Sequence, residues 1–143
     1  MISMKKFVLF LSFVIVTTLC VFAYDNSFYS ALQTCTHYVS TGNVNTEGMN
    51  VKVKEEILGK ENNKCVYKET IDISGSKSCI VCRFTQNQIN ELIKVMKAYS
   101  TIQEYTGEEV DTSKLSAVQN NPVVKVWNKY LNDSTVCNIE IQK

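Results

Sequence analysis

Five cysteines follow the apolar N-terminus, and two of them form a Cys-x-x-Cys motif, Cys79-Ile-Val-Cys82. A redox motif of this kind needs its first thiol at a helix N-terminus, where the helix dipole lowers the thiol pKa. Here the motif lies in an apolar stretch typical of a strand, and residues three apart on a strand point to opposite faces. A structural zinc site would need a second pair of ligands at similar spacing, and the sequence has none. We therefore predict neither redox nor metal chemistry for this motif.

The only histidine, His37, follows Cys35 by two residues. Residues at that spacing do not face each other on a helix, so a nucleophilic Cys–His pair is not expected. A serine nucleophile would need a Gly-x-Ser-x-Gly elbow, and none is present. The sequence thus offers no nucleophile with a partner base.

Acidic pairs are the remaining candidates for acid–base chemistry, namely Glu55 with Glu56 and Glu69 with Asp72. Two carboxylates that meet in space can cleave glycosidic bonds, but acidic side chains mostly face solvent. The acidic stretch 108–111 lacks the Asp and Gly pattern of a calcium-binding loop. We predict no catalytic residue, no cofactor and no metal site. An exported hydrolase that uses carboxylates is the least favoured function.

The N-terminus predicts a secretory signal peptide over residues 1–23. A short start containing two lysines precedes an uncharged apolar run over residues 7–22. This run is shorter than the roughly 20 apolar residues that cross a bilayer. Small residues before the junction predict cleavage between Ala23 and Tyr24. We expect a secreted or periplasmic protein without a stable membrane span after cleavage.

Residues 24–143 are predicted to form a single compact domain, because this length supports one hydrophobic core. The chain has a formal net charge of +1. A near-neutral chain lacks the basic footprint of a nucleic-acid-binding protein. Nucleic acid is therefore not an expected partner, whereas a protein or a component of the cell envelope is.

The apolar pattern predicts an α+β fold. Helical spacing occurs over residues 26–38, and strand-like alternation over residues 51–57, 65–73 and 78–84. Thr85 and Gln88 form a capping box that starts a second helix. Asn121-Pro122 starts a last helix, and residues 135–141 alternate like a terminal strand. We expect an antiparallel meander of three to four strands packed against two to three helices.

Strand alternation also sorts the cysteines. Cys65 and Cys82 fall on the apolar side of their strands, and Cys79 falls on the more polar side. An oxidising compartment favours disulfides. We predict that Cys35, Cys65, Cys82 and Cys137 form two bridges and that Cys79 stays unpaired. The three connectivities of the four remain open.

The stretch 40–50 is rich in Ser, Thr, Asn and Gly, a composition that favours turns around a short edge strand. Long polar loops held between regular elements are common sites of binding. We take this stretch as the predicted recognition loop, with side chains from Thr41, Asn43, Asn45, Glu47 and Met49. The favoured function is a non-catalytic binding or inhibitory module. The alternative is a structural or accessory subunit of a cell-envelope assembly.

Overall fold

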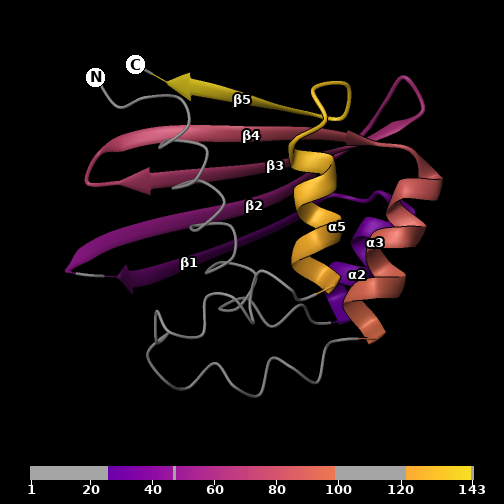
Figure 1. Ribbon diagram of the computed structural model, residues 1–143, viewed down its shortest axis with the longest axis horizontal. Helices are drawn as coiled ribbons and strands as arrows, with labels where there is room; N and C mark the ends of the chain where they lie inside the picture. Colours follow the sequence, from indigo (N-terminus) through magenta and orange to yellow (C-terminus); the bar gives the residue numbers. More distant parts are fainter. Residues whose placement is uncertain (1–25, 47, 99–121, 143) are drawn as a thin grey trace.

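The computed structural model describes residues 26–46, 48–98 and 122–142 (Figure 1). The described elements are, in chain order, α2 (Asn26–Thr34), β1 (Tyr38–Thr46), β2 (Met49–Glu61), β3 (Lys64–Ile73), β4 (Ser76–Phe84), α3 (Gln86–Ala98), α5 (Pro122–Leu131) and β5 (Cys137–Gln142). The predicted signal peptide, its cleavage site at Ala23 and Tyr24, Glu47 and the acidic stretch 108–111 lie outside the described residues. No helix of the described ranges is long and apolar enough to span a membrane.

The five strands form one antiparallel sheet in the order β1-β2-β3-β4-β5, as Figure 1 shows. Asn62 and Asn63 connect β2 to β3 with φ angles of 51° and 63°, which is the tight turn that matches the twist of a hairpin. Gly59 lies within β2, at a shift of register between Ile57 and Gly59. Its φ of 106° suits glycine at such an irregularity. The predicted α+β class with an antiparallel meander is confirmed.

The prediction that turns dominate residues 40–50 is wrong, because the edge strand expected there is long and takes up most of the stretch. Strand β1 pairs continuously with β2, from Tyr38 opposite Ile57 to Thr46 opposite Met49. The pairing ends at Thr46 and Met49, and Gly48 just before β2 adopts a φ of 78°. The composition of residues 40–50 was a poor guide because the strand propensity of a residue depends strongly on its neighbours in the sheet. A polar segment still forms a strand when a long neighbouring strand supplies its backbone partners.

Helix α2 ends four residues earlier than the predicted limit at Tyr38. Cys35 adopts a left-handed φ of 51° directly after the helix. The Cys35 N–H donates to the Leu32 carbonyl at 3.3 Å, and the Thr36 N–H donates to the Ala31 carbonyl at 2.9 Å. These two bonds satisfy carbonyls at the helix end in the manner of a Schellman motif. The chain then leaves the helix and enters β1.

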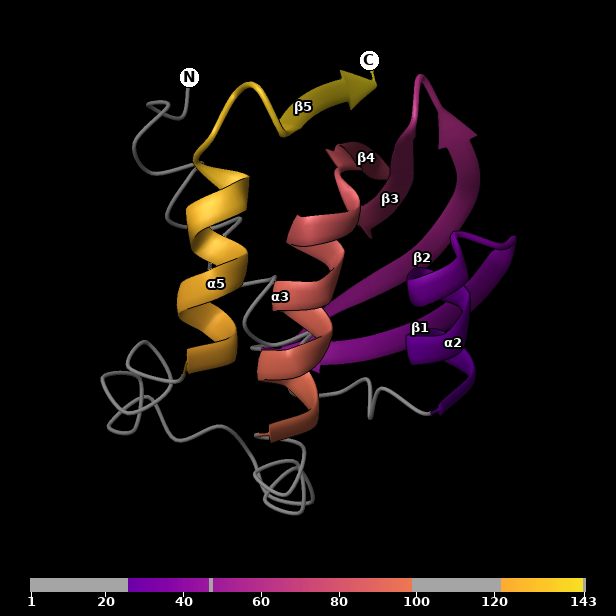
Figure 2. The ribbon, with the colours of Figure 1, turned by 90° about the vertical axis from the view of Figure 1, so that its right-hand side faces the viewer.

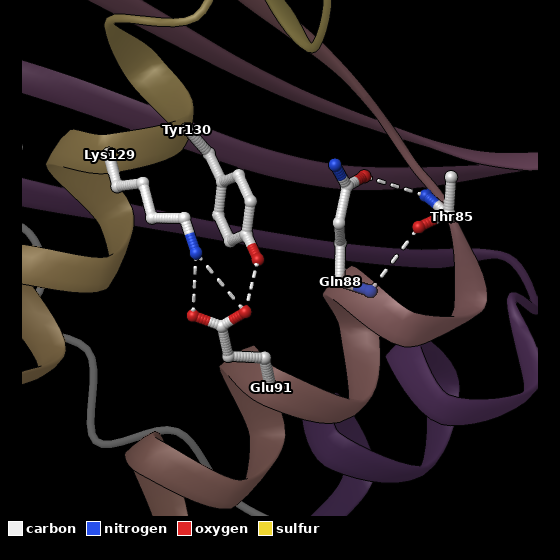
Figure 3. Close-up of polar contacts among 5 residues, drawn as sticks. All are labelled: Thr85, Gln88, Glu91, Lys129 and Tyr130. Atoms are coloured by element: carbon white, nitrogen blue, oxygen red, sulfur yellow. Dashed lines mark hydrogen bonds and ion pairs between the residues drawn. The ribbon is translucent and has the colours of Figure 1, made fainter.

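The predicted capping box starts helix α3. The Thr85 N–H donates to Gln88 Oε1 at 2.9 Å, and the Gln88 N–H donates to Thr85 Oγ1 at 3.3 Å (Figure 3). Two backbone donors at the helix start are thereby satisfied. The buried stripe of the helix consists of Ile89, Leu92, Ile93 and Met96.

The three described helices lie on one face of the sheet (Figure 2). The core between them contains an aromatic group in which the Trp127 ring lies 5.4 Å from Tyr67 and 5.9 Å from Phe84, centroid to centroid. Such aromatic pairs contribute about 0.5–1.5 kcal/mol beyond the area they bury. Trp127 is 2% exposed, so it serves the core rather than the surface.

Candidate functional site

Two disulfides are present, one between Cys35 and Cys65 and one between Cys82 and Cys137. The first joins the end of α2 to the start of β3, and the second joins residues that face each other across β4 and β5. These are the four cysteines that strand alternation selected, and the structure resolves their connectivity. Two disulfides indicate an oxidising environment.

Cys79 is a free thiol, as strand alternation predicts, but its surroundings differ from the expected polar face. It is 1% exposed and sits in the middle of β4, between Thr70 on β3 and Glu140 on β5. The Thr70 hydroxyl oxygen lies 3.6 Å from its sulfur. A buried thiol outside an electropositive site is unreactive.

His37 is exposed on the segment between α2 and β1. Cys35, two residues earlier, forms a disulfide with Cys65. It therefore has no thiolate that could act with His37 as a nucleophilic pair. Within the described residues, no group of three or more His, Cys, Asp or Glu side chains is arranged to hold a metal ion.

The structure brings together a different pair of carboxylates from those the sequence suggested. Glu55 and Glu69 face each other across β2 and β3, on the side of the sheet that carries the helices. They are 1% and 5% exposed, whereas Glu56 points to the opposite side and binds Lys54 at 3.0 Å. One sequence signal could have revealed the pair. Both residues occupy inward positions of an apolar alternation, between Val53 and Ile57 and between Tyr67 and Ile71.

A glutamate–tyrosine contact joins α3 to α5 (Figure 3). The Tyr130 hydroxyl donates to Glu91 Oε2 at 2.7 Å, and Lys129 Nζ donates to Glu91 Oε1 at 3.0 Å. The hydrogen bond from Tyr130 and then that from Lys129 lower the pKa of Glu91. Burial and the contact with Glu91 raise the pKa of Tyr130 to about 12. Both pKa values move away from neutrality, which suits a structural contact and not a general acid or base.

The predicted recognition residues Thr41, Asn43 and Asn45 lie along β1, one of the two outermost described strands of the sheet (Figure 1). All three side chains are exposed. Met49 begins β2, and Glu47 lies outside the described residues. The structure thus places three of the five residues on one exposed strand, which presents backbone groups as well as side chains.

The register of the hairpin decides which backbone groups of β1 point outward. Thr46 and Met49 flank a two-residue loop, and the residues flanking such a loop form a hydrogen-bonded pair. Hydrogen-bonded pairs then recur at every second residue along the strand. The N–H and C=O groups of Thr41, Asn43 and Asn45 therefore point away from β2, toward the outer edge.

Strand β1 also lacks the features that normally keep a sheet edge from pairing. Its sequence, Tyr-Val-Ser-Thr-Gly-Asn-Val-Asn-Thr, contains no charged residue and no proline. Its pairing with β2 runs from one end to the other without a bulge. Natural edge strands are commonly protected by charged side chains, proline, bulges or short length. By these criteria neither the sequence nor the register of β1 protects its outer edge.

Comparison with known proteins identifies no matching family, and no curated protein or solved structure is significantly similar to this chain.

Proposed function

We propose that this protein is an exported, non-catalytic binding module that recognises an extended segment of a partner protein. The segment adds as a further strand to the outer edge of β1, a mode of recognition known as β-augmentation. The observation that carries the proposal is the nine-residue β1 strand, which has no charge and no proline and is regular along its length.

Backbone hydrogen bonds would supply the affinity in this mode. The outward N–H and C=O groups of Thr41, Asn43 and Asn45 recur at every second residue, the spacing that an added antiparallel or parallel strand requires. Side chains would supply the selectivity. Val39 is 44% exposed and precedes these residues on the same face, so it offers an apolar contact at one end of the strand.

The export part of the proposal rests on the N-terminal sequence and on the two disulfides. The apolar run over residues 7–22 has the length and flanks of a signal sequence. The disulfides Cys35–Cys65 and Cys82–Cys137 fit an oxidising compartment. An edge strand facing that compartment would meet partners that are secreted or held in the cell envelope.

A photo-crosslinking experiment tests the proposal. A crosslinking amino acid replaces Asn45, and the intact protein is exposed to the exported and envelope fractions of its source cell. We expect an adduct that disappears when Asn43→Pro is added, because proline removes an outward N–H and obstructs an incoming strand. The matched control is Asn43→Ala, which keeps the backbone N–H and should keep the adduct.

The same crosslinker at Asn138 on β5 serves as a control for position. An adduct that forms equally from Asn45 and Asn138, or that survives Asn43→Pro, would contradict the assignment to the β1 edge. Circular dichroism of each variant confirms that the fold is retained before any loss is interpreted.

A further inference from the structure

Three residues on the helix-covered side of the sheet form a compact polar cluster within the core. The Tyr67 hydroxyl oxygen lies 3.0 Å from Glu55 Oε1 and 3.0 Å from Glu69 Oε2. The exposed fractions are 1% for Glu55, 2% for Tyr67 and 5% for Glu69. Two carboxyl groups therefore approach one phenol in a part of the protein from which solvent is nearly excluded.

The number of protons in this cluster follows from its geometry. A phenol carries one hydrogen, so the Tyr67 hydroxyl can donate to only one carboxylate at a time. Two oxygens held 3.0 Å apart need a proton between them to attract each other. The second contact is satisfied when the other carboxyl keeps its own proton and donates to the Tyr67 oxygen. Two buried carboxylates this close also disfavour simultaneous ionisation.

We propose that Glu55, Tyr67 and Glu69 share a carboxyl proton in the folded state at neutral pH, which makes the stability of the fold sensitive to alkalinity. The proton belongs to the pair of carboxyl groups and not to one of them. The cluster lies on β2 and β3, where Glu55 is flanked by Ser40 of β1 and Glu69 by Ile80 of β4. Neither flanking residue brings a charge.

Other titratable groups occur on the described helices that cover this face. Glu91 is engaged by Lys129 and by the Tyr130 hydroxyl, and Lys97 Nζ lies 5.5 Å from the centre of the Tyr29 ring. The complete set on these helices is Tyr29 on α2, Glu91, Lys94 and Lys97 on α3, and Lys125, Lys129 and Tyr130 on α5. The proton count at Tyr67 does not depend on any of them, because it follows from the single hydrogen of the phenol.

The direction of the pH effect follows from linkage. Keeping the proton in the folded state raises the pKa of the pair above the value of about 4.3 for a free glutamate. Between the pKa of free glutamate and the raised pKa of the folded pair, the folded state binds more protons than the unfolded chain. Stability from the cluster is therefore complete below the unfolded pKa and is lost as the pH rises through the folded pKa. The unfolding equilibrium constant should rise by up to tenfold per pH unit in that window.

Denaturant unfolding of the full chain, measured from mildly acidic to mildly alkaline pH, tests the proposal. Glu55→Gln and Glu69→Gln each leave one carboxyl that can ionise alone and an amide that can donate to Tyr67. We expect the unfolding constant of the wild type, divided by that of either variant, to rise by up to tenfold per pH unit. Glu56→Gln, on the opposite face of the same strand, should follow the pH dependence of the wild type.

Two results would overturn the proposal. One is a ratio of unfolding constants that does not change with pH in either variant. The other is a ratio that falls as the pH rises, which would mean that both carboxylates are ionised and favourably paired in the folded state.

Nuclear magnetic resonance of the wild type covers the case in which a glutamine variant does not fold. The side-chain carboxyl carbons of Glu55 and Glu69 are followed through a pH titration of the folded protein. We expect the pair to release one proton at a pH clearly above that of the exposed glutamates. Release of both protons at or below the pH of the exposed glutamates would refute proton sharing.

Discussion

The two outer strands of the sheet differ in how they are held. Strand β5 is joined to β4 by the Cys82–Cys137 disulfide, and the Arg83 N–H donates to the Val136 carbonyl at 2.8 Å just before β5 begins. Strand β1 has the Cys35–Cys65 disulfide shortly before its first residue. After this disulfide, β1 forms backbone hydrogen bonds with β2 and with no other described strand.

This difference separates an edge fixed by a covalent link from the edge to which we assign binding in the proposed function. A covalent link between paired residues keeps β5 in place, and Glu140 adds a charge to that strand. Strand β1 is longer, has no charge and is anchored at one end. In the proposed function, β1 would keep its register with β2 while its outer backbone groups contact the added strand.

Removal of the β5 link should have the largest effect on stability. Replacing both Cys82 and Cys137 by alanine should lower the free energy of unfolding by about 2–4 kcal/mol, because the unfolded chain regains the freedom that the bridge removes. Chemical denaturation of the variant beside the wild type measures the loss. Amide hydrogen exchange should speed up in β5 more than in β1. Equal acceleration in both strands would show that the bridge does not hold β5 selectively.

Proline substitution at neighbouring positions of β1 should sharpen the contrast between its inner and outer sides. Gly42→Pro removes an N–H that the register directs to β2, so it leaves a carbonyl of the ladder without its donor. Asn43→Pro removes an N–H that points outward. We expect Gly42→Pro to destabilise the protein by about 1–3 kcal/mol more than Asn43→Pro. Equal losses would contradict the assigned direction of the backbone groups.

A smaller effect is expected at Glu91, which ties α3 to α5, the helix before β5. Contacts with Tyr130 and Lys129 lower the pKa of Glu91. Its contribution to stability is therefore present above the unfolded glutamate pKa and is lost as the pH falls through the folded pKa. Glu91→Gln should cost about 1 kcal/mol or less at neutral pH, since the site is partly exposed.

The pH dependence of that loss distinguishes the ion pair from simple packing. Thermal unfolding curves of Glu91→Gln and the wild type should converge as the pH approaches the acid range, where Glu91 is protonated in both states. A loss that remains constant down to acid pH would indicate that charge on Glu91 does not stabilise the contact between α3 and α5.

Local signals in the sequence predicted much of this fold. The capping box of Thr85 and Gln88 formed as expected because its bonds lie within one helical turn. Strand alternation separated Cys79 from Cys65 and Cys82 because side chains of a strand point to alternate faces. In both cases the deciding interaction spans few residues.

The features that escaped prediction depend on how one strand pairs with the next. Strand β1 looks like a loop by composition and becomes a strand because β2 supplies its backbone partners. The approach of Glu55 to Glu69 depends on the β2–β3 register, which neither strand specifies alone. The apolar alternation around each glutamate did indicate burial, because it placed a carboxylate at a position that normally faces the core.

Residue-resolved amide hydrogen exchange along β1 tests the central claim most directly, first in the free protein and then with the partner captured by crosslinking. We predict that the amides of Thr41, Asn43 and Asn45 exchange rapidly in the free protein, while those of Ser40 and Gly42 are protected by β2. All five amides should be protected in the complex. Protection of the three outward amides in the free protein, or their continued rapid exchange in the complex, would contradict recognition at the β1 edge.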